Sequence, residues 1–167
     1  MSKKLMLYGA NGYTSRLIIK ELVGQNIKPI LAGRNKDKIN NLAEKHGFDS
    51  SVFSLEKSDN IDEKLEDIDV LINAAGPYSL TAIPLIDSCI RSKTHYVDIT
   101  GEIDVFVYAE SKHKEAKDAG IIICPGVGFD VIPTDCLSYL LKDKLPDANE
   151  LNICFFSENG RPSIGTA

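Results

Sequence analysis

The residues whose types and spacing most clearly suit ligand binding lie near the N-terminus, in the segment Gly9-Ala-Asn-Gly-Tyr-Thr-Ser15. Gly9 and Gly12 stand between a short apolar segment and an amphipathic one. In a dinucleotide-binding turn, the first glycine permits a tight bend and the second lets the backbone approach a pyrophosphate at the helix N-terminus. Ser15 replaces the third, helix-packing glycine of such turns, and its small side chain is expected to keep the close packing of helix on strand, somewhat loosened. An ordinary tight turn is the alternative interpretation. We predict dinucleotide contacts from Gly9, Asn11, Gly12, Tyr13 and Thr14.

The residues after the second apolar segment indicate which dinucleotide binds. An acidic residue there would accept hydrogen bonds from the ribose 2′-hydroxyl of NAD, but this sequence has Ala32-Gly-Arg-Asn-Lys36. Arg34 offers a planar fork for a 2′-phosphate, and neighbouring lysines add positive charge. Asp37 is the only acid nearby, and it lies within the following helix. We therefore predict NADP(H) rather than NAD(H), with contacts from Arg34 and Asn35; solvated residues at a helix start would look the same.

A third turn, Asn73-Ala-Ala-Gly-Pro-Tyr78, follows a short apolar segment further along the chain. Its small residues would let a cofactor cross the ends of the strands, where ligands bind in open α/β sheets. Tyr78 could stack against a ring or pack on its own loop. We predict cofactor contacts from Ala75, Gly76 and Pro77.

Segments that suit strands alternate with segments that suit helices throughout the chain. This alternation, with short glycine-rich turns, predicts right-handed βαβ units and an α/β fold with a doubly wound parallel sheet of the Rossmann type. The first helix, ending near Gly24, is expected to bury Leu17, Ile18 and Leu22, with Ile19 as a further candidate for the buried side. The other expected helices cover residues 35–46, 61–66, 81–93, 104–119 and 131–145, and the expected strands cover residues 4–8, 29–32, 52–55, 69–74, 96–99, 121–124 and 150–157.

Composition and charge exclude several classes of protein. The 167 residues carry a net charge of −5, but the first 50 contain nine basic and four acidic residues. This basic region suits an anionic ligand, although a solvated basic face would look the same. The acidic remainder, without a dense Lys/Arg run, argues against nucleic acid. No apolar run approaches the roughly 18 residues of a membrane span, and the apolar N-terminal stretch is too short for a signal peptide. We expect a cytoplasmic protein.

Cysteine and histidine usage points to no metal site. Cys89, Cys124, Cys136 and Cys154 are widely spaced, and the three histidines do not fall into ligand spacing. We expect the four cysteines to be buried, reduced thiols within apolar elements, as is usual in the cytoplasm.

Five segments of the chain form a recognisable series: Gly9-Ala-Asn-Gly-Tyr-Thr, Ala32-Gly-Arg34, Ala75-Gly-Pro-Tyr78, His95-Tyr-Val-Asp98 with Gly101-Glu102, and Gly128-Phe-Asp-Val-Ile-Pro-Thr-Asp135. Their order resembles that in the saccharopine dehydrogenase-like oxidoreductases, which include the trans-acting enoyl reductases. The sequence departs from the family at Ser15, where glycine is usual, and at Asn11, where threonine is common. The closing Ser163-Ile-Gly-Thr166 resembles the family's Gly-Thr element at the start of a second domain.

This resemblance implies an NADP-binding domain over residues 1–149. Residues 150–167 would then form the first strand and start of a mostly β substrate domain that continues beyond this chain. The implied activity is hydride transfer between nicotinamide and a small organic substrate, and a homo-oligomer could form through the missing domain.

No catalytic residue is assigned from the sequence. Asp98 and Glu102 follow a strand, where they could contact substrate or nicotinamide, although Glu102 also suits the first turn of a helix and we favour that structural role. Asp130 has the same ambiguity as a candidate helix cap.

Two rival functions remain. Tyr108-Ala-Glu-Ser-Lys112 matches the Tyr-x-x-x-Lys pattern of short-chain dehydrogenases, but a pattern this short arises readily by chance. Only about 30 residues separate Gly76 from Tyr108, which leaves no room for the long helix of those enzymes. The second rival is an NADP(H)-sensing or interaction domain without catalysis.

Overall fold

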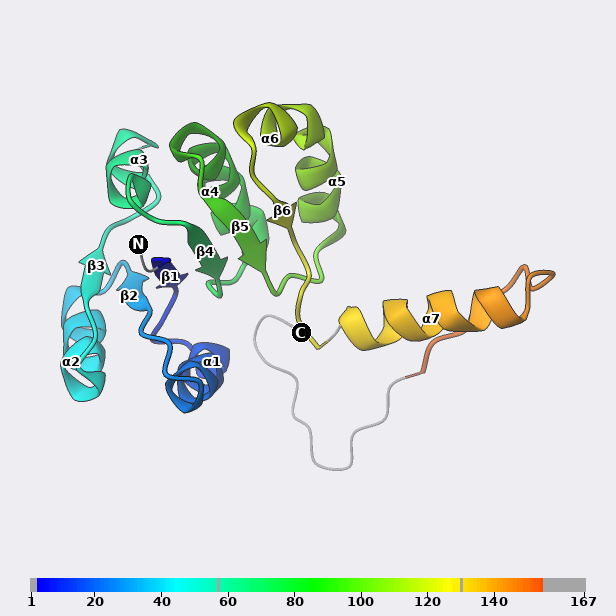
Figure 1. Cartoon of the computed structure of the whole chain (residues 1–167), viewed down its shortest axis with the longest axis horizontal. Coiled ribbons are helices and arrows are strands. Elements are labelled where there is room, and N and C mark those ends of the chain that lie inside the picture. Colours follow the sequence, from blue (N-terminus) through cyan, green and yellow to red (C-terminus); the bar gives the residue numbers. More distant parts are fainter. Residues whose placement is uncertain (1–2, 57, 130, 155–167) are drawn as a thin grey trace.

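A computed structural model describes residues 3–56, 58–129 and 131–154. In these residues six parallel strands form one sheet in the order β3-β2-β1-β4-β5-β6 (Figure 1). This strand order confirms the expected Rossmann-type fold. The strands are β1 (Leu5–Tyr8), β2 (Ile30–Gly33), β3 (Ser50–Val52), β4 (Val70–Asn73), β5 (His95–Asp98) and β6 (Ile123–Cys124).

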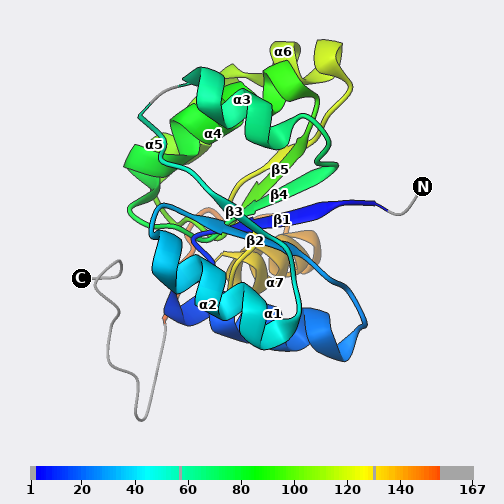
Figure 2. The ribbon, with the colours of Figure 1, turned by 90° about the vertical axis from the view of Figure 1, so that its left-hand side faces the viewer.

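Helices cover both faces of the sheet, but unequally. Helices α1 and α2 lie on one face, and α3 to α6 lie on the other (Figures 1 and 2). Helix α7 projects away from the sheet (Figure 1). The helices are α1 (Tyr13–Gly24), α2 (Lys36–His46), α3 (Ser58–Leu65), α4 (Tyr78–Ser92), α5 (Ile103–Ser111), α6 (His113–Ala119) and α7 (Ile132–Lys144).

The alternation of side chains along each strand divides the core into two clusters. Leu7 of β1 packs on the α1 side with Ile19 and Ile39. Met6 of β1 packs on the opposite side, in the larger cluster that includes Leu71 of β4 and the α3–α6 helices. Each fully buried aliphatic side chain stabilises the fold by about 1.5–3 kcal/mol. The sheet therefore carries most of its apolar packing under α3 to α6.

The strand order changes direction between β1 and β4. Tyr8 pairs with Ala32 of β2 on one side and with Asn73 of β4 on the other. The chain leaves β1 toward one face of the sheet and leaves β4 toward the other, so the two connections diverge (Figure 2). A crevice opens at such a point in doubly wound sheets, outside the carboxyl ends of the strands.

Three local expectations were wrong. Strand β3 covers Ser50–Val52 rather than residues 52–55. Leu17, expected on the buried side of α1, is 54% exposed, because the buried side passes through Ser15 and Ile19. The single helix expected over residues 104–119 is two helices: the amide of Lys112 donates to the carbonyl of Ala109, and this tighter turn ends α5.

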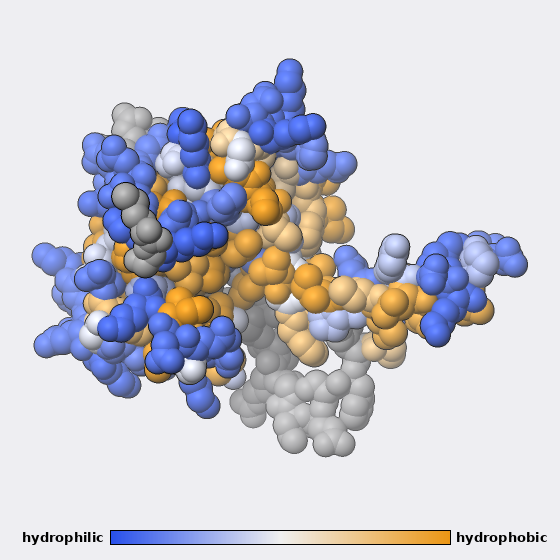
Figure 3. Space-filling model, in the orientation of Figure 1, coloured by the Kyte–Doolittle hydropathy of each residue, from blue (hydrophilic) through white to orange (hydrophobic). Residues whose placement is uncertain are grey.

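The C-terminal part also differs from expectation. Residues 150–154 are described and form no strand, while residues 155–157 of the expected strand lie outside the described residues, as do Asp130 and the Ser163–Thr166 motif. Helix α7 buries none of its side chains. Its apolar residues, including Leu137 and Leu140, run along the projecting arm (Figure 3).

The expectation of buried cysteines is correct only for Cys89. Cys136 lies on the unburied helix α7, Cys124 ends the edge strand β6, and both are exposed, as is Cys154.

None of the helices in the described ranges combines the length and the apolar character that crossing a membrane requires.

Candidate functional site

A cleft of about 470 Å³ lies at the carboxyl ends of β1 and β4. Seven of the residues predicted to contact a dinucleotide line it together, although they come from three separate turns. These are Gly9, Asn11, Gly12, Arg34, Ala75, Gly76 and Pro77. The structure thus brings together the turns after β1, β2 and β4.

Gly9 sits where any other residue would be obstructed. Its φ angle is +79°, a conformation that side chains strongly disfavour. A Cβ atom there would lie 2.8 Å from both the Cβ and the backbone nitrogen of Ala75. The amide of Gly9 donates to the carbonyl of Ala32 at 2.9 Å. The absence of a side chain therefore lets the β1 turn lie directly against the β4 turn.

The N-terminus of α1 faces this cleft without a side-chain cap. Gly12 is the N-cap residue, and no side chain accepts a hydrogen bond there. The first turn also contains no acidic residue. Uncapped first-turn amides and the helix dipole together favour an anion such as a pyrophosphate.

Ser15 replaces the usual glycine without loosening the packing. It is buried, and its hydroxyl donates to the carbonyl of Gly9 at 2.8 Å. This hydrogen bond ties the first turn of α1 to the strand end. The side chains of Tyr13 and Thr14 are exposed and outside the cleft lining, so any contact from these two residues would come through their backbone amides.

Arg34 lines the cleft at the carboxyl end of β2. The positive charge of Arg34 acts on Tyr8, which also lines the cleft. Burial raises the pKa of Tyr8, and the Arg34 guanidinium opposes that rise. Asn35 lies outside the lining, and its side-chain oxygen accepts from the amide of Lys38 at 3.0 Å as the cap of α2. Arg34 is therefore the residue of this pair that faces the cleft.

Several lining residues were not predicted from the sequence. The segment after β3 contributes one wall, because β3 ends at the same edge of the sheet as β1 and β2. Tyr8 forms part of the floor, with its ring centroid 4.9 Å from that of Phe53. The alternation of strands and helices indicates that strand ends meet at one edge of the sheet, but it does not show which strand ends meet at this cleft. The unpredicted residues are Tyr8, Gly33, Ser54, Leu55, Glu56, Ala74, Leu80 and Thr81.

Glu102 has a structural role, but at a helix other than its own. Its two carboxylate oxygens accept from the amides of Tyr78 and Ser79, each at 2.7 Å, at the N-terminus of α4. Desolvation raises the pKa of Glu102, but the hydrogen bonds from Tyr78 and Ser79 together lower it by more, so that its pKa lies below the ordinary value of 4.5. Glu102 thus fixes the end of the β4 turn, which lines the cleft.

We expect Glu102→Gln to reduce the stability of the chain by about 1 kcal/mol, the usual magnitude of a helix cap. A lowered folded-state pKa contributes stability that is present above the unfolded pKa and is lost as pH falls through the folded pKa. The wild-type chain should therefore lose this contribution progressively as the pH falls from 4.5 through the lower folded-state pKa, whereas the variant should not. Urea unfolding at pH 7 and at pH 3.5 measures the free energy of unfolding of the wild-type chain and of the variant. If these free energies differed by the same amount at the two pH values, the assignment would be contradicted.

Asp98 is fully buried and does not face the cleft. Its carboxyl group accepts from the hydroxyl of Tyr96 at 2.7 Å and from the amides of Thr100 and Gly126. All of these partners belong to the protein. Asp98 is therefore placed to organise loops rather than to contact a substrate.

Tyr108 and Lys112 do not form a catalytic pair at the cleft. The hydroxyl of Tyr108 donates to Asp87 of α4 at 2.6 Å, and the amine of Lys112 lies 3.5 Å from the same carboxylate. Burial, together with Asp87, raises the pKa of Tyr108 to about 12. A proton-transferring group needs a pKa near the working pH, so this environment argues against the short-chain dehydrogenase mechanism.

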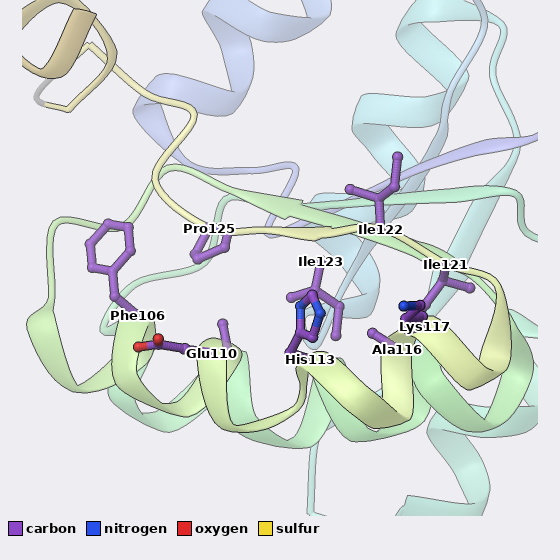
Figure 4. A pocket seen from close by; sticks show the side chains of 10 residues that line it. Phe106, Glu110, His113, Ala116, Lys117, Ile121, Ile122, Ile123 and Pro125 are labelled. Carbon is purple, nitrogen blue, oxygen red and sulfur yellow. The ribbon is translucent and has the colours of Figure 1, made fainter. Parts of the chain in front are cut away.

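A second hollow of about 510 Å³ lies between β6 and the helices α5 and α6. Figure 4 shows the side chains of His113 and Lys117, both on α6, pointing toward the segment that carries Ile121 and Ile123. This hollow lies away from the point where the strand order reverses. Here and elsewhere in the described ranges, no three His, Cys, Asp or Glu residues are grouped so as to hold a metal ion.

Comparison with known proteins agrees with this geometry. A family model described as "Saccharopine dehydrogenase NADP binding domain" matches residues 5–124. A human saccharopine dehydrogenase-like oxidoreductase is 26% identical over 161 residues, covering 84% of this chain and 38% of the relative. A trans-acting enoyl reductase from Mycobacterium ulcerans is 31% identical over 144 residues, covering 79% of this chain and 34% of the relative.

The solved structures include a similar fold. Apo saccharopine dehydrogenase (L-Glu forming) from Saccharomyces cerevisiae matches with a TM-score of 0.74 at 23% identity. The match covers 88% of this chain and 32% of the yeast chain, so this chain spans about a third of that protein. Because the family match covers most of residues 1–167, the chain belongs to the saccharopine dehydrogenase family and forms its NADP-binding domain.

Proposed function

We propose that this chain provides the NADP(H) site of an oxidoreductase that transfers a hydride between nicotinamide and a small organic substrate. The observation that carries the proposal is the cleft itself, where the uncapped N-terminus of α1 and the side chain of Arg34 flank the ends of β1 and β4. The human and mycobacterial relatives are named as oxidoreductase and enoyl reductase. Substrate-binding residues would come from the part of those longer proteins that this chain does not span.

The residues of the cleft suit the parts of NADPH in turn. The first-turn amides of α1 would bind the pyrophosphate, and Arg34 would bind the 2′-phosphate through its guanidinium fork. The backbone of Ala75 and Gly76 would accommodate the nicotinamide half at the end of β4. Bound NADPH supplies the hydride; the chain binds the cofactor and sets its orientation.

The cofactor preference depends on Arg34. We expect the chain to bind NADPH more tightly than NADH, and Arg34→Ala to weaken NADPH binding by about 10–100-fold, because a buried or bidentate charged hydrogen bond is worth roughly 1.5–3 kcal/mol. NADH affinity should change little, since NADH lacks the 2′-phosphate. Fluorescence titration of the chain and the variant with both cofactors gives the four dissociation constants.

Two further variants test the role of Arg34 specifically. Arg34→Lys keeps the charge but loses the planar fork, so it should fall between wild type and Arg34→Ala. Lys45→Ala removes a positive charge from the last turn of α2, outside the cleft lining, and should leave both affinities unchanged. An equal loss of NADPH and NADH binding in Arg34→Ala would contradict the assignment to the 2′-phosphate.

We also propose the domain boundary near residue 149, a cytoplasmic location and a homo-oligomer formed through the second domain. The boundary is supported by the end of α7 at Lys144 and by the family's Gly-Thr motif at residues 163–166. The location is supported by four free cysteines. Limited proteolysis of the full-length protein tests the boundary, and fractionation tests the location.

A further inference from the structure

A hydrogen-bond network of buried polar groups lies beneath the carboxyl ends of β4 and β5 and leads away from the cleft. It begins at Asn73, the last residue of β4, whose side-chain oxygen accepts from the amide of Ala75 at 3.1 Å. The side-chain nitrogen of Asn73 donates to the hydroxyl of Tyr96 at 3.1 Å. That hydroxyl in turn donates to Asp98. Asn73, Tyr96 and Asp98 are each fully buried, so water does not compete for these hydrogen bonds.

Asp98 connects this hydrogen-bond network to the loop that follows β6. Its other carboxyl oxygen accepts from the amide of Gly126 at 2.8 Å, and its backbone carbonyl accepts from the amide of Val127 at 2.8 Å. Gly126 has a φ angle of +73°, and a Cβ atom there would lie 2.5 Å from the ring of Phe106. The loop that follows β6, residues 125–129, is therefore fixed to the end of β5.

The same carboxyl group also reaches the far end of the cofactor turn. Asp98 accepts from the amide of Thr100, and the hydroxyl of Thr100 accepts from the amide of Glu102 at 3.0 Å. Glu102 then holds the amide of Tyr78. The turn at residues 75–78 is thus held at its first residue through Asn73 and at its last through Glu102, and both routes meet at Asp98.

We propose that Asp98 is a positioning residue: its buried carboxyl group fixes the cofactor turn, residues 75–78, relative to the loop that follows β6. The consequence for cofactor affinity rests on the proposed NADP(H) function. The loop after β6 carries the chain away from the sheet toward α7 (Figure 1). The side chain of Asp98 therefore fixes both the position of the cofactor turn and the position of the loop through which the polypeptide leaves the sheet.

Because each hydrogen bond has a fixed donor and acceptor, the network is disrupted even by a substitution that keeps the size of the side chain. In Asp98→Asn, one side-chain oxygen is replaced by an N–H donor. If that donor faces Tyr96, the hydroxyl meets a second N–H group besides that of Asn73, and its own proton loses its acceptor. If the donor faces Gly126 instead, it meets the amides of Gly126 and Thr100. Either orientation leaves at least one buried donor without an acceptor, which costs more than a missing contact.

Hydrogen–deuterium exchange of the whole chain tests this proposal without any cofactor. Tyr96→Phe keeps the ring but removes the hydroxyl, and it should accelerate exchange about tenfold both at residues 75–78 and at residues 125–127. Tyr108→Phe is the matched control, because it removes a similar hydroxyl–carboxyl hydrogen bond to Asp87 elsewhere. Acceleration at one segment only, at neither, or equally throughout β1 and β2 would overturn the proposal.

Cofactor titration separates positioning from direct binding. Tyr96→Phe and Asp98→Asn should weaken NADPH and NADH by the same factor, about five- to tenfold, unlike Arg34→Ala. The affinity of the double variant should fall by less than the product of the two factors, because both substitutions disrupt the same hydrogen-bond network. Independent effects would overturn the proposal. If the wild-type chain bound neither cofactor, the proposed function would fail, and the exchange experiment would still decide the role of Asp98.

Discussion

Gly9→Ala should abolish measurable NADPH binding, with a loss of affinity of about 100-fold or more, equivalent to ~2.8 kcal/mol. The new Cβ atom would be placed 2.8 Å from the backbone nitrogen of Ala75, and backbone atoms cannot move aside as a side-chain tip can. The φ angle of +79° adds strain for alanine. The turns after β1 and β4 must separate, and they form opposite sides of the proposed cofactor site. Fluorescence titration with NADPH measures the loss.

Gly24→Ala supplies the control for this substitution. Gly24 is the last residue of α1, and a Cβ atom there would meet nothing within 4 Å. The same chemical change should therefore leave NADPH affinity unaltered and should slightly favour the helix. If Gly9→Ala bound NADPH as tightly as Gly24→Ala, the close approach of the two turns would not matter for the cofactor.

Leu71→Ala should be among the most destabilising substitutions of a single core residue, at about 3 kcal/mol. Leu71 lies in the central strand β4, is 0% exposed, and packs in the cluster beneath α3 to α6. Truncation would leave a cavity that the surrounding strands and helices cannot fill, because β4 is hydrogen-bonded on both sides. The free energy of unfolding in urea, compared with wild type, measures the effect.

The neighbouring residue provides the comparison. Ile72 follows Leu71 on the same strand, so its side chain points to the opposite face, where it is only partly buried. Ile72→Ala should cost clearly less, about half as much as Leu71→Ala. Equal losses at the two positions would show that the sheet is packed alike on both faces, contrary to the distribution of its helices.

The order of the elements was predictable, while the faces and boundaries of some were not. Apolar segments bounded by glycine located the parallel strands, because few other folds bury so many short apolar runs. Leu17, Ile18 and Ile19 are consecutive apolar residues, so the sequence alone could not decide which of them faces the sheet. The break at Lys112 depends on a single tightened turn that carries no glycine or proline to mark it.

The cofactor site shows the same division. Glycines and Arg34 were found because their roles follow from local position: a turn after a strand, or a residue at a strand end. Glu102 could be suspected of stabilising a helix, but its partners lie 23 and 24 residues away, on α4. The wall after β3, with Ser54 and Glu56, was missed because its position depends on where strands meet at the sheet edge. Contacts between distant segments need the fold, whereas local ones do not.

The pairing of β1 with β4 has a consequence for how the protein folds. It joins Leu5 with Val70 and Tyr8 with Asn73, so a chain segment of more than 60 residues must be closed before these strands meet. Pairing across such long segments is slow to form. The crevice exists only after that closure, whereas β1 and β2 can already pair without it. A dinucleotide bound there would report that the two halves of the sheet have joined, and would stabilise the joined state by mass action.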